Sequence, residues 1–328
     1  MIITSWTRNR WIGLAFAFAT AGIGAIEPAA SEELWFAPQD NLVRFGKRSN
    51  EDFPRLFDKA SEWPKAASHT KVIDLTSFYF MRAADPDLRA TLDYLGAHRI
   101  ALNVSILALP AENCGRGVEG ILPDLIQTRA PVIRLKQLNA DVASFGFDEP
   151  LEYGHIYKGR AACNFPVGEV AKRVAMTVRE ARSLYPEAKF IDYEVPQDLP
   201  LAEWTQALNE WLSAYQQATG TPLDGFAIDA HFREAWEEPA RRTIDILHSK
   251  GVKAGIFLNA PGGPNVTDES WMMEAKQNIL KVLAAKLPLD FVVITTWVGH
   301  PSRNVPETDP LALTSLINWY AEHRVVGR

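Results

Sequence analysis

Phe145-Gly146-Phe147-Asp148-Glu149-Pro150 is an apolar run that ends in two carboxylates and a proline. Proline has no backbone N–H and interrupts a buried strand, so the run predicts a strand that ends at the two acids. Two adjacent carboxylates at a buried strand end are costly unless a partner or a reaction uses them. Functional residues of α/β proteins follow the carboxyl ends of parallel strands. The stretch therefore predicts a strand end that opens onto a functional cleft.

Short apolar runs of this kind alternate with amphipathic helical segments along the chain. The expected strands cover 72–80, 99–106, 117–120, 142–147, 190–195, 225–230, 253–258 and 291–296, and 117–120 has the weakest pattern. The expected helices cover 53–66, 86–98, 122–139, 167–185, 201–219, 238–250, 268–286 and 309–323. Buried parallel strands read as continuous apolar runs.

This alternation predicts the fold class α/β, as a (β/α)8 TIM barrel in a single domain. A doubly wound open sheet is the alternative if 117–120 is not a strand. No glycine-rich phosphate loop follows the first expected strand, so the pattern does not indicate a nucleotide-binding site. We expect no cofactor.

The N-terminus has the pattern of a secretory signal peptide. Arg8 and Arg10 precede a short apolar run at 11–19, and small residues follow up to Ser31. A positive start, a short apolar region and small residues at a cleavage point are typical of exported proteins. We therefore expect residues 1–30 to be a signal peptide, 31–328 to be the barrel domain, and the mature protein to be secreted or periplasmic, without a membrane span.

The amino-acid composition limits the kinds of ligand that the protein is expected to bind. The 328 residues carry a formal net charge of -6 and no block of like charge that would indicate a nucleic-acid surface. Ten tryptophans provide flat faces that suit both a core and a sugar ligand. Cys114 and Cys163 are compatible with a disulfide in an oxidising compartment, or with two free thiols.

Acidic residues dominate the expected strand ends. They are Asp74, Glu119, Asp148, Glu149, Asp192, Glu194 and Asp229, followed by His231, Asn259 and Trp297. Residues two apart on a strand share a face, so Asp192 and Glu194 should point the same way, as should Asp229 and His231. If those faces point into the barrel mouth, like charges push the pKa values of the carboxyls apart. One acid then stays protonated while another is ionised, which is what glycosidic bond hydrolysis needs.

The chain resembles the (β/α)8-barrel glycoside hydrolases. Asp148-Glu149-Pro150 is similar to the Asn-Glu-Pro motif of their large retaining clan, in which the glutamate that ends the fourth strand is the acid/base. The resemblance implies that Glu149 is the general acid. Trp297, at the end of the eighth expected strand, resembles the tryptophan that forms a sugar platform in that clan.

Two residues depart from the clan's pattern. The clan has a nucleophilic glutamate at the end of the seventh strand, where this chain has Asn259, and it has asparagine where this chain has Asp148. The partner of Glu149 is therefore expected on another strand, with Asp229 and Glu194 as candidates. A second clan of barrel glycosidases, with carboxylates after the fourth and sixth strands, would match Asp148 and Asp229.

The remaining residues are candidates for binding the sugar, each with a structural alternative. Asp74 fits a hydrogen bond to a neighbouring loop or arginine equally well, and Asp192 fits the positioning of a partner. His231 would tune Asp229, bind substrate or serve the structure alone. Tyr153, in the loop after Pro150, would line the cleft or cover it.

These observations favour an exported glycoside hydrolase that acts on a polysaccharide or oligosaccharide. Its catalytic candidates are Glu149, Asp229, Glu194 and Asp148, and its binding candidates are Trp297, Asn259, His231, Asp74, Asp192 and Tyr153. The alternative is a non-catalytic carbohydrate-binding barrel in exopolysaccharide assembly or export, which the absence of a glutamate at position 259 motivates. A metal-dependent hydrolase is a weaker third class, because the first expected strand has no His-x-His pattern.

Overall fold

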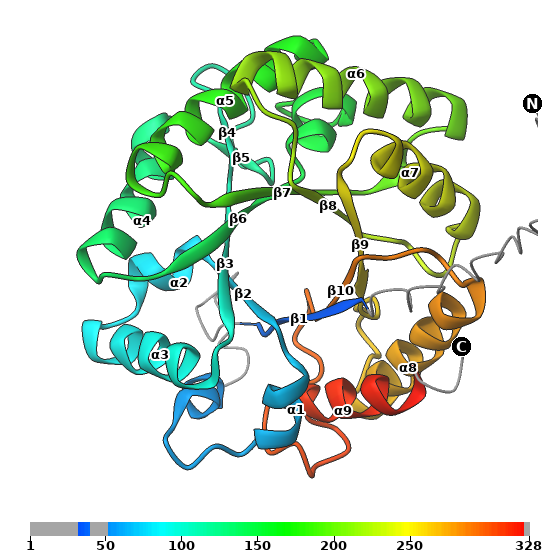
Figure 1. The fold of residues 1–328 in the computed structure, drawn as a ribbon. Coiled ribbons are helices and arrows are strands. Elements are labelled where there is room, and N and C mark those ends of the chain that lie inside the picture. The colour runs from blue at the N-terminus through cyan, green and yellow to red at the C-terminus, as the bar shows by residue number, and fades with distance from the viewer. Residues whose placement is uncertain (1–31, 40–51, 325–328) are drawn as a thin grey trace, which may run out of the picture. The chain divides into compact units, whose positions relative to one another are not determined.

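Eight parallel strands close into a barrel in the computed structural model, which describes residues 32–39 and 52–324. Figure 1 looks along the barrel and shows the strands as a ring with the helices outside it. The order around the ring is β1-β10-β9-β8-β7-β6-β3-β2, and β1 pairs in parallel with both β10 and β2, which closes it. The strands are β1 (Glu33–Ala37), β2 (Val72–Thr76), β3 (Ala101–Ile106), β6 (Val142–Asp148), β7 (Lys189–Glu194), β8 (Gly225–Ile228), β9 (Lys253–Leu258) and β10 (Phe291–Thr295).

Helices follow the strands and cover the outside of the barrel. They are α1 (Pro64–His69), α2 (Ser77–Arg82), α3 (Asp85–His98), α4 (Leu125–Gln137), α5 (Val167–Leu184), α6 (Leu201–Thr219), α7 (Glu237–Ser249), α8 (Asp268–Ala285) and α9 (Leu313–His323). Three short helical turns lie in the connections: η1 (Phe53–Phe57), η2 (Glu152–Ile156) and η3 (Pro196–Asp198). The predicted (β/α)8 barrel is thus confirmed.

Two errors in the strand prediction offset each other. The segment 33–37, which the sequence pattern left outside the strands, is the first barrel strand, β1. Residues 117–120 form turns rather than a strand, and the following Ile121–Leu122 (β5) pairs only with Leu109–Pro110 (β4) in a separate two-stranded sheet. Both errors precede β6, which therefore remains the fourth barrel strand.

Two other predicted elements differ from the structure in their extent. The strand expected over 72–80 ends at Thr76, whose side chain accepts a hydrogen bond from the N–H of Tyr79 and caps α2. The helix expected over 53–66 is two pieces, η1 and α1. The expected signal peptide at 1–30 lies outside the described residues. None of the helices in the described ranges is long and apolar enough to cross a membrane.

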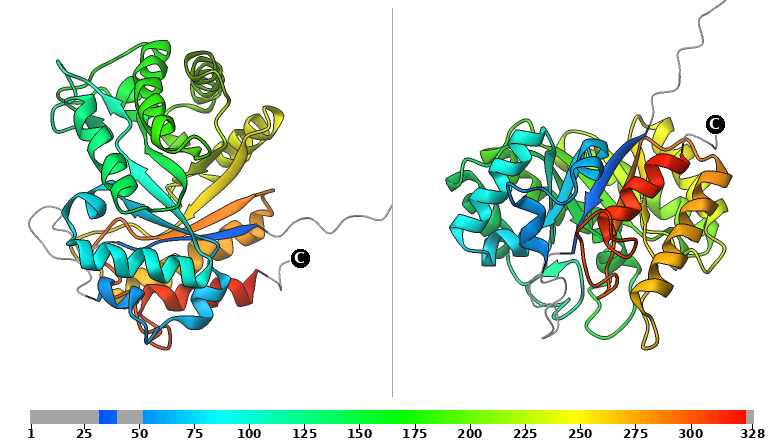
Figure 2. Two further views of the ribbon diagram at one scale, coloured as in Figure 1. Left: turned by 60° about the vertical axis from the view of Figure 1, so that its left-hand side comes forward. Right: turned by 90° about the horizontal axis from the view of Figure 1, so that it is seen from below.

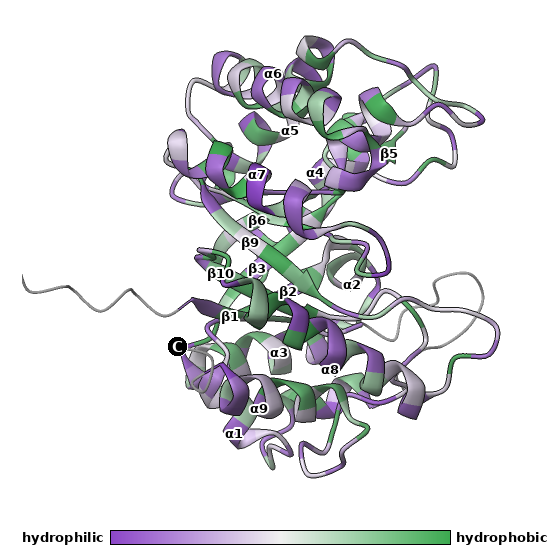
Figure 3. Ribbon diagram, turned by 90° about the vertical axis from the view of Figure 1, so that its right-hand side faces the viewer, coloured by the Kyte–Doolittle hydropathy of each residue, from purple (hydrophilic) through white to green (hydrophobic). Residues whose placement is uncertain are grey.

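Side chains of β6 alternate between the helices and the barrel interior. Phe145 and Phe147 are fully buried against helix-side aromatic residues, which include Phe190. Gly146 points inward, where a Cβ atom would lie only 2.2 Å from the Tyr193 hydroxyl oxygen. The glycine of the opening sequence therefore makes room for a tyrosine from the neighbouring strand β7. Figure 3 shows mostly hydrophobic strands surrounded by helices that mix hydrophobic and hydrophilic residues.

The barrel interior combines an apolar cluster with a polar network. The apolar cluster includes Trp35, Val72, Ile191, Phe257 and Phe291. In the polar network, Asp74 accepts hydrogen bonds from Asn103 Nδ2 (2.8 Å), Ser105 Oγ (2.7 Å) and the Tyr193 hydroxyl (3.0 Å). Burial raises the pKa of Asp74, and these donors oppose that shift. The network satisfies a carboxyl that the apolar interior would otherwise exclude.

Asp192 lies on the side of β7 that faces α6, opposite the side that carries Tyr193 into the barrel interior. Its side chain has no exposed surface, and Oδ2 accepts a 2.6 Å hydrogen bond from the indole N–H of Trp211. Burial raises the pKa of Asp192 well above its usual range, and the Trp211 bond opposes the shift. This bond is one of the polar contacts that hold α6 on the barrel.

We expect Trp211→Phe to lower the free energy of unfolding by about 2–3 kcal/mol, because it leaves a buried carboxyl oxygen without a donor. Trp204→Phe is the matched control, since Trp204 is equally buried on α6 and its indole N–H donates to the neutral Thr243 hydroxyl (2.8 Å). It should cost about 1 kcal/mol less. Urea denaturation measures both, and equal losses would contradict a special role for the Asp192 bond.

Candidate active site

Four strand ends bring acidic, amide and aromatic side chains to one end of the barrel. Glu149 follows β6, Asp229 follows β8, Asn259 follows β9 and Trp297 comes shortly after β10. Because all strands are parallel, their carboxyl ends lie on the same face. The right-hand view of Figure 2 shows the β4–β5 segment and the β10–α9 connection projecting from the same end of the barrel.

Glu149 is the most strongly perturbed acid of this group. Burial raises its pKa well above the usual range, and the negative charges of Asp148, Asp229 and Glu119 raise it further. A hydrogen bond with Tyr153 opposes the shift only in part. Asp148, the last residue of β6, shares the interior-facing side of the strand with Gly146 and adds its charge directly beside Glu149. The surroundings therefore favour a protonated Glu149.

A loop from the β3–β6 connection completes the surroundings of Glu149. The Tyr153 hydroxyl lies between Glu149 and Glu119 and donates to Glu119 Oε2 at 3.2 Å. Gly120, with φ +70°, approaches so closely that a Cβ would lie 2.5 Å from the Asp148 carbonyl oxygen. The Cys114–Cys163 disulfide fixes this loop to the segment that follows η2. Of the alternatives left open by the sequence, the structure thus shows the paired cysteines, and it brings Tyr153 to Glu149.

Asp229 has a different environment, with an N–H donor on each carboxylate oxygen. Asn259 Nδ2 donates to Oδ1 at 3.2 Å, and the Trp297 indole N–H donates to Oδ2 at 3.0 Å. Burial raises the pKa of Asp229 to about 6, while both hydrogen bonds and the charge of His231 act in the opposite direction. These donors stabilise the ionised form. The neighbours of Glu149 therefore favour its protonated form, whereas the hydrogen-bond donors around Asp229 favour its ionised form.

Trp297 is both a partner of Asp229 and an exposed aromatic face. The side chain is 41% exposed, and its ring packs edge-on against Phe257 with 5.2 Å between the ring centroids. An exposed indole whose N–H is fixed presents its flat face in one orientation, which suits stacking against an amphipathic ligand.

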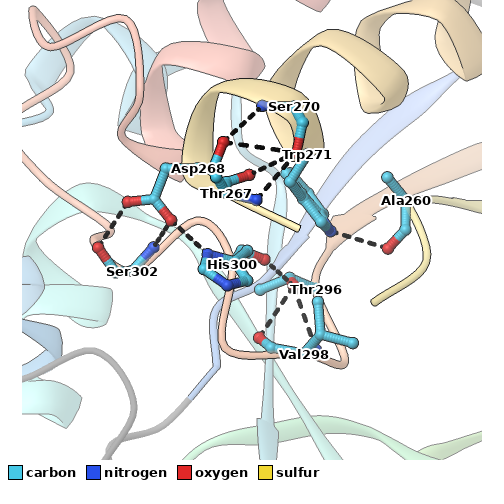
Figure 4. Close-up of polar contacts among 9 residues, drawn as sticks. All are labelled: Ala260, Thr267, Asp268, Ser270, Trp271, Thr296, Val298, His300 and Ser302. Carbon is cyan, nitrogen blue, oxygen red and sulfur yellow. Dashed lines mark hydrogen bonds and ion pairs between the residues drawn. The ribbon is translucent and has the colours of Figure 1, made fainter. Parts of the chain in front are cut away.

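The loop that carries Trp297 is anchored to the start of α8, as Figure 4 shows. Asp268 accepts hydrogen bonds from the Ser302 hydroxyl (2.6 Å) and backbone N–H (2.9 Å), and its other contact is His300 Nδ1 at 2.7 Å. The Thr296 hydroxyl donates to the His300 carbonyl within the same loop. Despite opposing burial, these bonds to Ser302 and His300 lower the pKa of Asp268. The loop is thereby held by an ionised carboxylate.

His231 and Asp198 lie beside Asp229 without a hydrogen bond to it in the described contacts. His231 is exposed, and its backbone carbonyl accepts a hydrogen bond from Gln197 Nε2 at 3.2 Å. The charges of His231 and Asp198 act on the pKa of Asp229 in opposite directions. His231 therefore lies at the edge of the site, consistent with a residue that tunes Asp229.

Three residues expected at the barrel mouth lie elsewhere. Asp74 is inside the barrel, where protein donors occupy its oxygens. Asp192 and Glu194 do share a face of β7, but both are fully buried on the side opposite the barrel interior, so the expectation that this face lines the cleft is wrong. Asp192 bonds Trp211 on α6, and Glu194 bonds the backbone N–H groups of residues 151 and 152. The interior face of β7 is instead occupied by Ile191 and Tyr193.

Two acids near the site were not among the catalytic or binding candidates from sequence. Glu119 lay in a segment with a weak strand pattern, and Asp198 lies in the short turn η3 after β7. The signal for Glu119 was Gly117 and Gly120 around it, which are typical of a tight loop. Among residues 32–39 and 52–324, no cluster of three or more His, Cys, Asp or Glu side chains has an arrangement that would hold a metal ion.

Solved structures with this fold include several barrel enzymes. Xylanase 10B from Thermotoga maritima is 11% identical, with a TM-score of 0.52, and the match covers 90% of this chain and 96% of that chain. A psychrophilic glycoside hydrolase family 10 endo-beta-1,4-xylanase is 12% identical, with a TM-score of 0.51 over 86% of this chain and 89% of that chain. A glucosidase from Croceicoccus marinus is 11% identical, with a TM-score of 0.52 over 89% of this chain and 68% of that chain.

No protein-family model and no curated protein matches the sequence. At this level of identity, the likeness to solved structures is one of fold. This chain has the (β/α)8 barrel that those glycoside hydrolases also have.

Proposed function

We propose that this chain is an exported glycoside hydrolase in which Glu149 is the general acid and Asp229 is its carboxylate partner. The observation that carries the proposal is the unequal environment of the two acids. Burial and the surrounding negative charges raise the pKa of Glu149, whereas both oxygens of Asp229 accept N–H hydrogen bonds. A protonated acid facing an ionised carboxylate is the arrangement that hydrolysis of a glycosidic bond requires.

In this mechanism Glu149 donates its proton to the glycosidic oxygen as the bond to the leaving sugar breaks. Asp229 supplies the negative charge, either as the base that activates water or as the nucleophile at the anomeric carbon. Asn259 occupies the position where the large retaining clan has its glutamate, and here it serves as a hydrogen-bond donor to Asp229. Trp297 fixes the other Asp229 oxygen and offers its exposed ring to the sugar.

Export is part of the proposal. The N-terminal sequence has a signal-peptide pattern. The Cys114–Cys163 disulfide supports an oxidising compartment, because disulfides persist mainly outside the cytosol. Both observations favour a secreted or periplasmic enzyme.

The second candidate function is carbohydrate binding without turnover. Asn259 favours it, since an amide replaces the carboxylate expected after β9 and occupies an Asp229 oxygen. Glycan binding without any release of reducing ends, across a broad polysaccharide panel, would support this alternative over hydrolysis.

Glu149→Gln should lower the rate of reducing-end release by about 10²–10⁴-fold, because glutamine has no proton to donate to the leaving group. Glu152→Gln is the matched control, since Glu152 lies in the same segment as Glu149. Burial and the charge of Asp198 raise the pKa of Glu152 to about 7, and the charge of Glu149 is not among the causes. The control should keep activity within a few-fold. Full activity of Glu149→Gln would contradict the assignment of the acid.

The pH dependence of kcat/KM should be bell-shaped. Activity should rise with pH as Asp229, with a pKa of about 6, loses its proton, and should fall when Glu149 loses its own at higher pH. Trp297→Phe removes one N–H donor from the ionised Asp229 but keeps an aromatic ring. It should therefore raise the pKa of Asp229 and move the acidic limb to higher pH. An acidic limb that stays in place, or moves to lower pH, would contradict the proposed role of Asp229.

A further inference from the structure

Glu194 is a fully buried carboxyl that the proposed chemistry does not use. It ends β7, the strand between β6 and β8, and its side chain has no exposed surface. Its two oxygens accept separate hydrogen bonds, from the N–H of Leu151 at 2.6 Å and from the N–H of Glu152 at 2.9 Å. Both donors belong to the backbone that follows Glu149 and Pro150.

The main chain of Glu194 contacts the other half of the site. Its carbonyl oxygen accepts a 3.0 Å hydrogen bond from the N–H of Asp229. Glu194 therefore makes two kinds of contact. Its side chain bonds the segment after Glu149, and its backbone carbonyl bonds the N–H of Asp229. Glu194 links Glu149 and Asp229 across the intervening strand.

The backbone at Glu149 needs such support. Glu149 has φ +50°, in the left-handed region that is strained for a non-glycine residue. Pro150 has no N–H, so the first donors after Glu149 are those of Leu151 and Glu152, at the start of a helical turn that leaves them without helical partners. Glu194 takes both of them. Without it, two buried N–H groups would lose their acceptors and the strained conformation would lose its restraint.

A carboxyl in this position is expensive, which argues for a specific use. Burial raises the pKa of Glu194 well above its usual range, as do the charges of Asp192 and Glu149, and only the two backbone N–H groups oppose the shift. An apolar side chain would avoid that cost but could not accept either hydrogen bond. The carboxyl that is costly to bury is therefore also the one that orders the loop after Glu149.

We propose that Glu194 is a positioning residue that sets the placement of Glu149 relative to Asp229. The effect of Glu194 on turnover rests on the proposed function, whereas its hydrogen bonds to the loop after Glu149 do not. The role differs from that expected from sequence, where Glu194 was a candidate partner of the acid. Its oxygens accept hydrogen bonds from backbone N–H groups, and its side chain has no exposed surface.

The test compares Glu194→Gln with Asp224→Asn. Glutamine keeps the length of the side chain but turns an -NH₂ group toward one of the two N–H donors. Asp224 is a matched control at the opposite end of β7, where its carboxylate accepts a 2.9 Å hydrogen bond from the N–H of Phe190. Glu194→Gln should lower kcat by about 10–100-fold, because small displacements of a catalytic group have effects of that size. KM should stay within about 3-fold of wild type, since the proposed sugar contacts remain, and Asp224→Asn should leave kcat unchanged.

Amide hydrogen exchange, followed by NMR, gives a readout that needs no substrate. The amides of Leu151 and Glu152 should be protected in wild type, and at least one of them should lose protection in Glu194→Gln, whereas neither should in Asp224→Asn. If Glu194→Gln does not fold, Glu194→Asp keeps the carboxyl group with one methylene fewer and should show the same loss.

Retained protection of both amides, or an unchanged kcat in a variant that has lost their protection, would overturn the positioning role. An equal loss of kcat in Asp224→Asn would overturn it as well, by indicating a general effect of destabilisation. A wild-type chain that hydrolyses no glycan would contradict the proposed function instead, and the exchange data would still decide whether Glu194 holds the loop.

Discussion

The parallel register of β6, β7 and β8 is the constraint on which the proposed site depends. It places Asp148 beside Tyr193 and Glu194 beside Ile228, so that Glu149 and Asp229 emerge on either side of one strand end. The packing of the barrel maintains this register, because Gly146 leaves the space that Tyr193 fills. Tyr193 in turn donates to Asp74 in the polar network of the interior. The spacing of the acids at the mouth thus rests on contacts deep in the barrel.

The electrostatics of the mouth follow from this geometry. Carboxyls crowded in a partly buried space cannot all ionise, and the distribution of donors determines which of them does. Asn259 and Trp297 supply N–H groups to Asp229, while Glu149 has mainly acidic neighbours and the Tyr153 hydroxyl. Asn259, which follows β9, therefore stabilises the ionised form of Asp229, which follows β8.

The sequence predicted the barrel and the strand-end position of Glu149, Asp229 and Trp297, because apolar runs that end in polar residues mark the carboxyl ends of buried strands. It failed where local pattern and tertiary context disagree. The strand 33–37 begins with a charged residue next to the N-terminal segment, and the true third barrel strand was counted as the second. The sequence pattern also did not reveal which face of β7 points into the barrel. Asp192 accepts a hydrogen bond from Trp211 on α6, and Glu194 accepts two from the backbone of the loop after Glu149, contacts that no spacing rule reveals.

In the proposed mechanism, Glu149 and Asp229 form one electrostatically coupled pair with opposite preferred protonation states. Carboxyl ¹³C NMR titration of the wild-type protein and of Asp229→Asn measures this directly. Asp229 should titrate at about pH 6 in wild type, and Glu149 should titrate well above the usual glutamate range. Removal of the Asp229 charge should lower the pKa of Glu149. Two carboxyls that titrate independently at ordinary values, with Glu149 unaffected by Asp229→Asn, would contradict this electrostatic coupling.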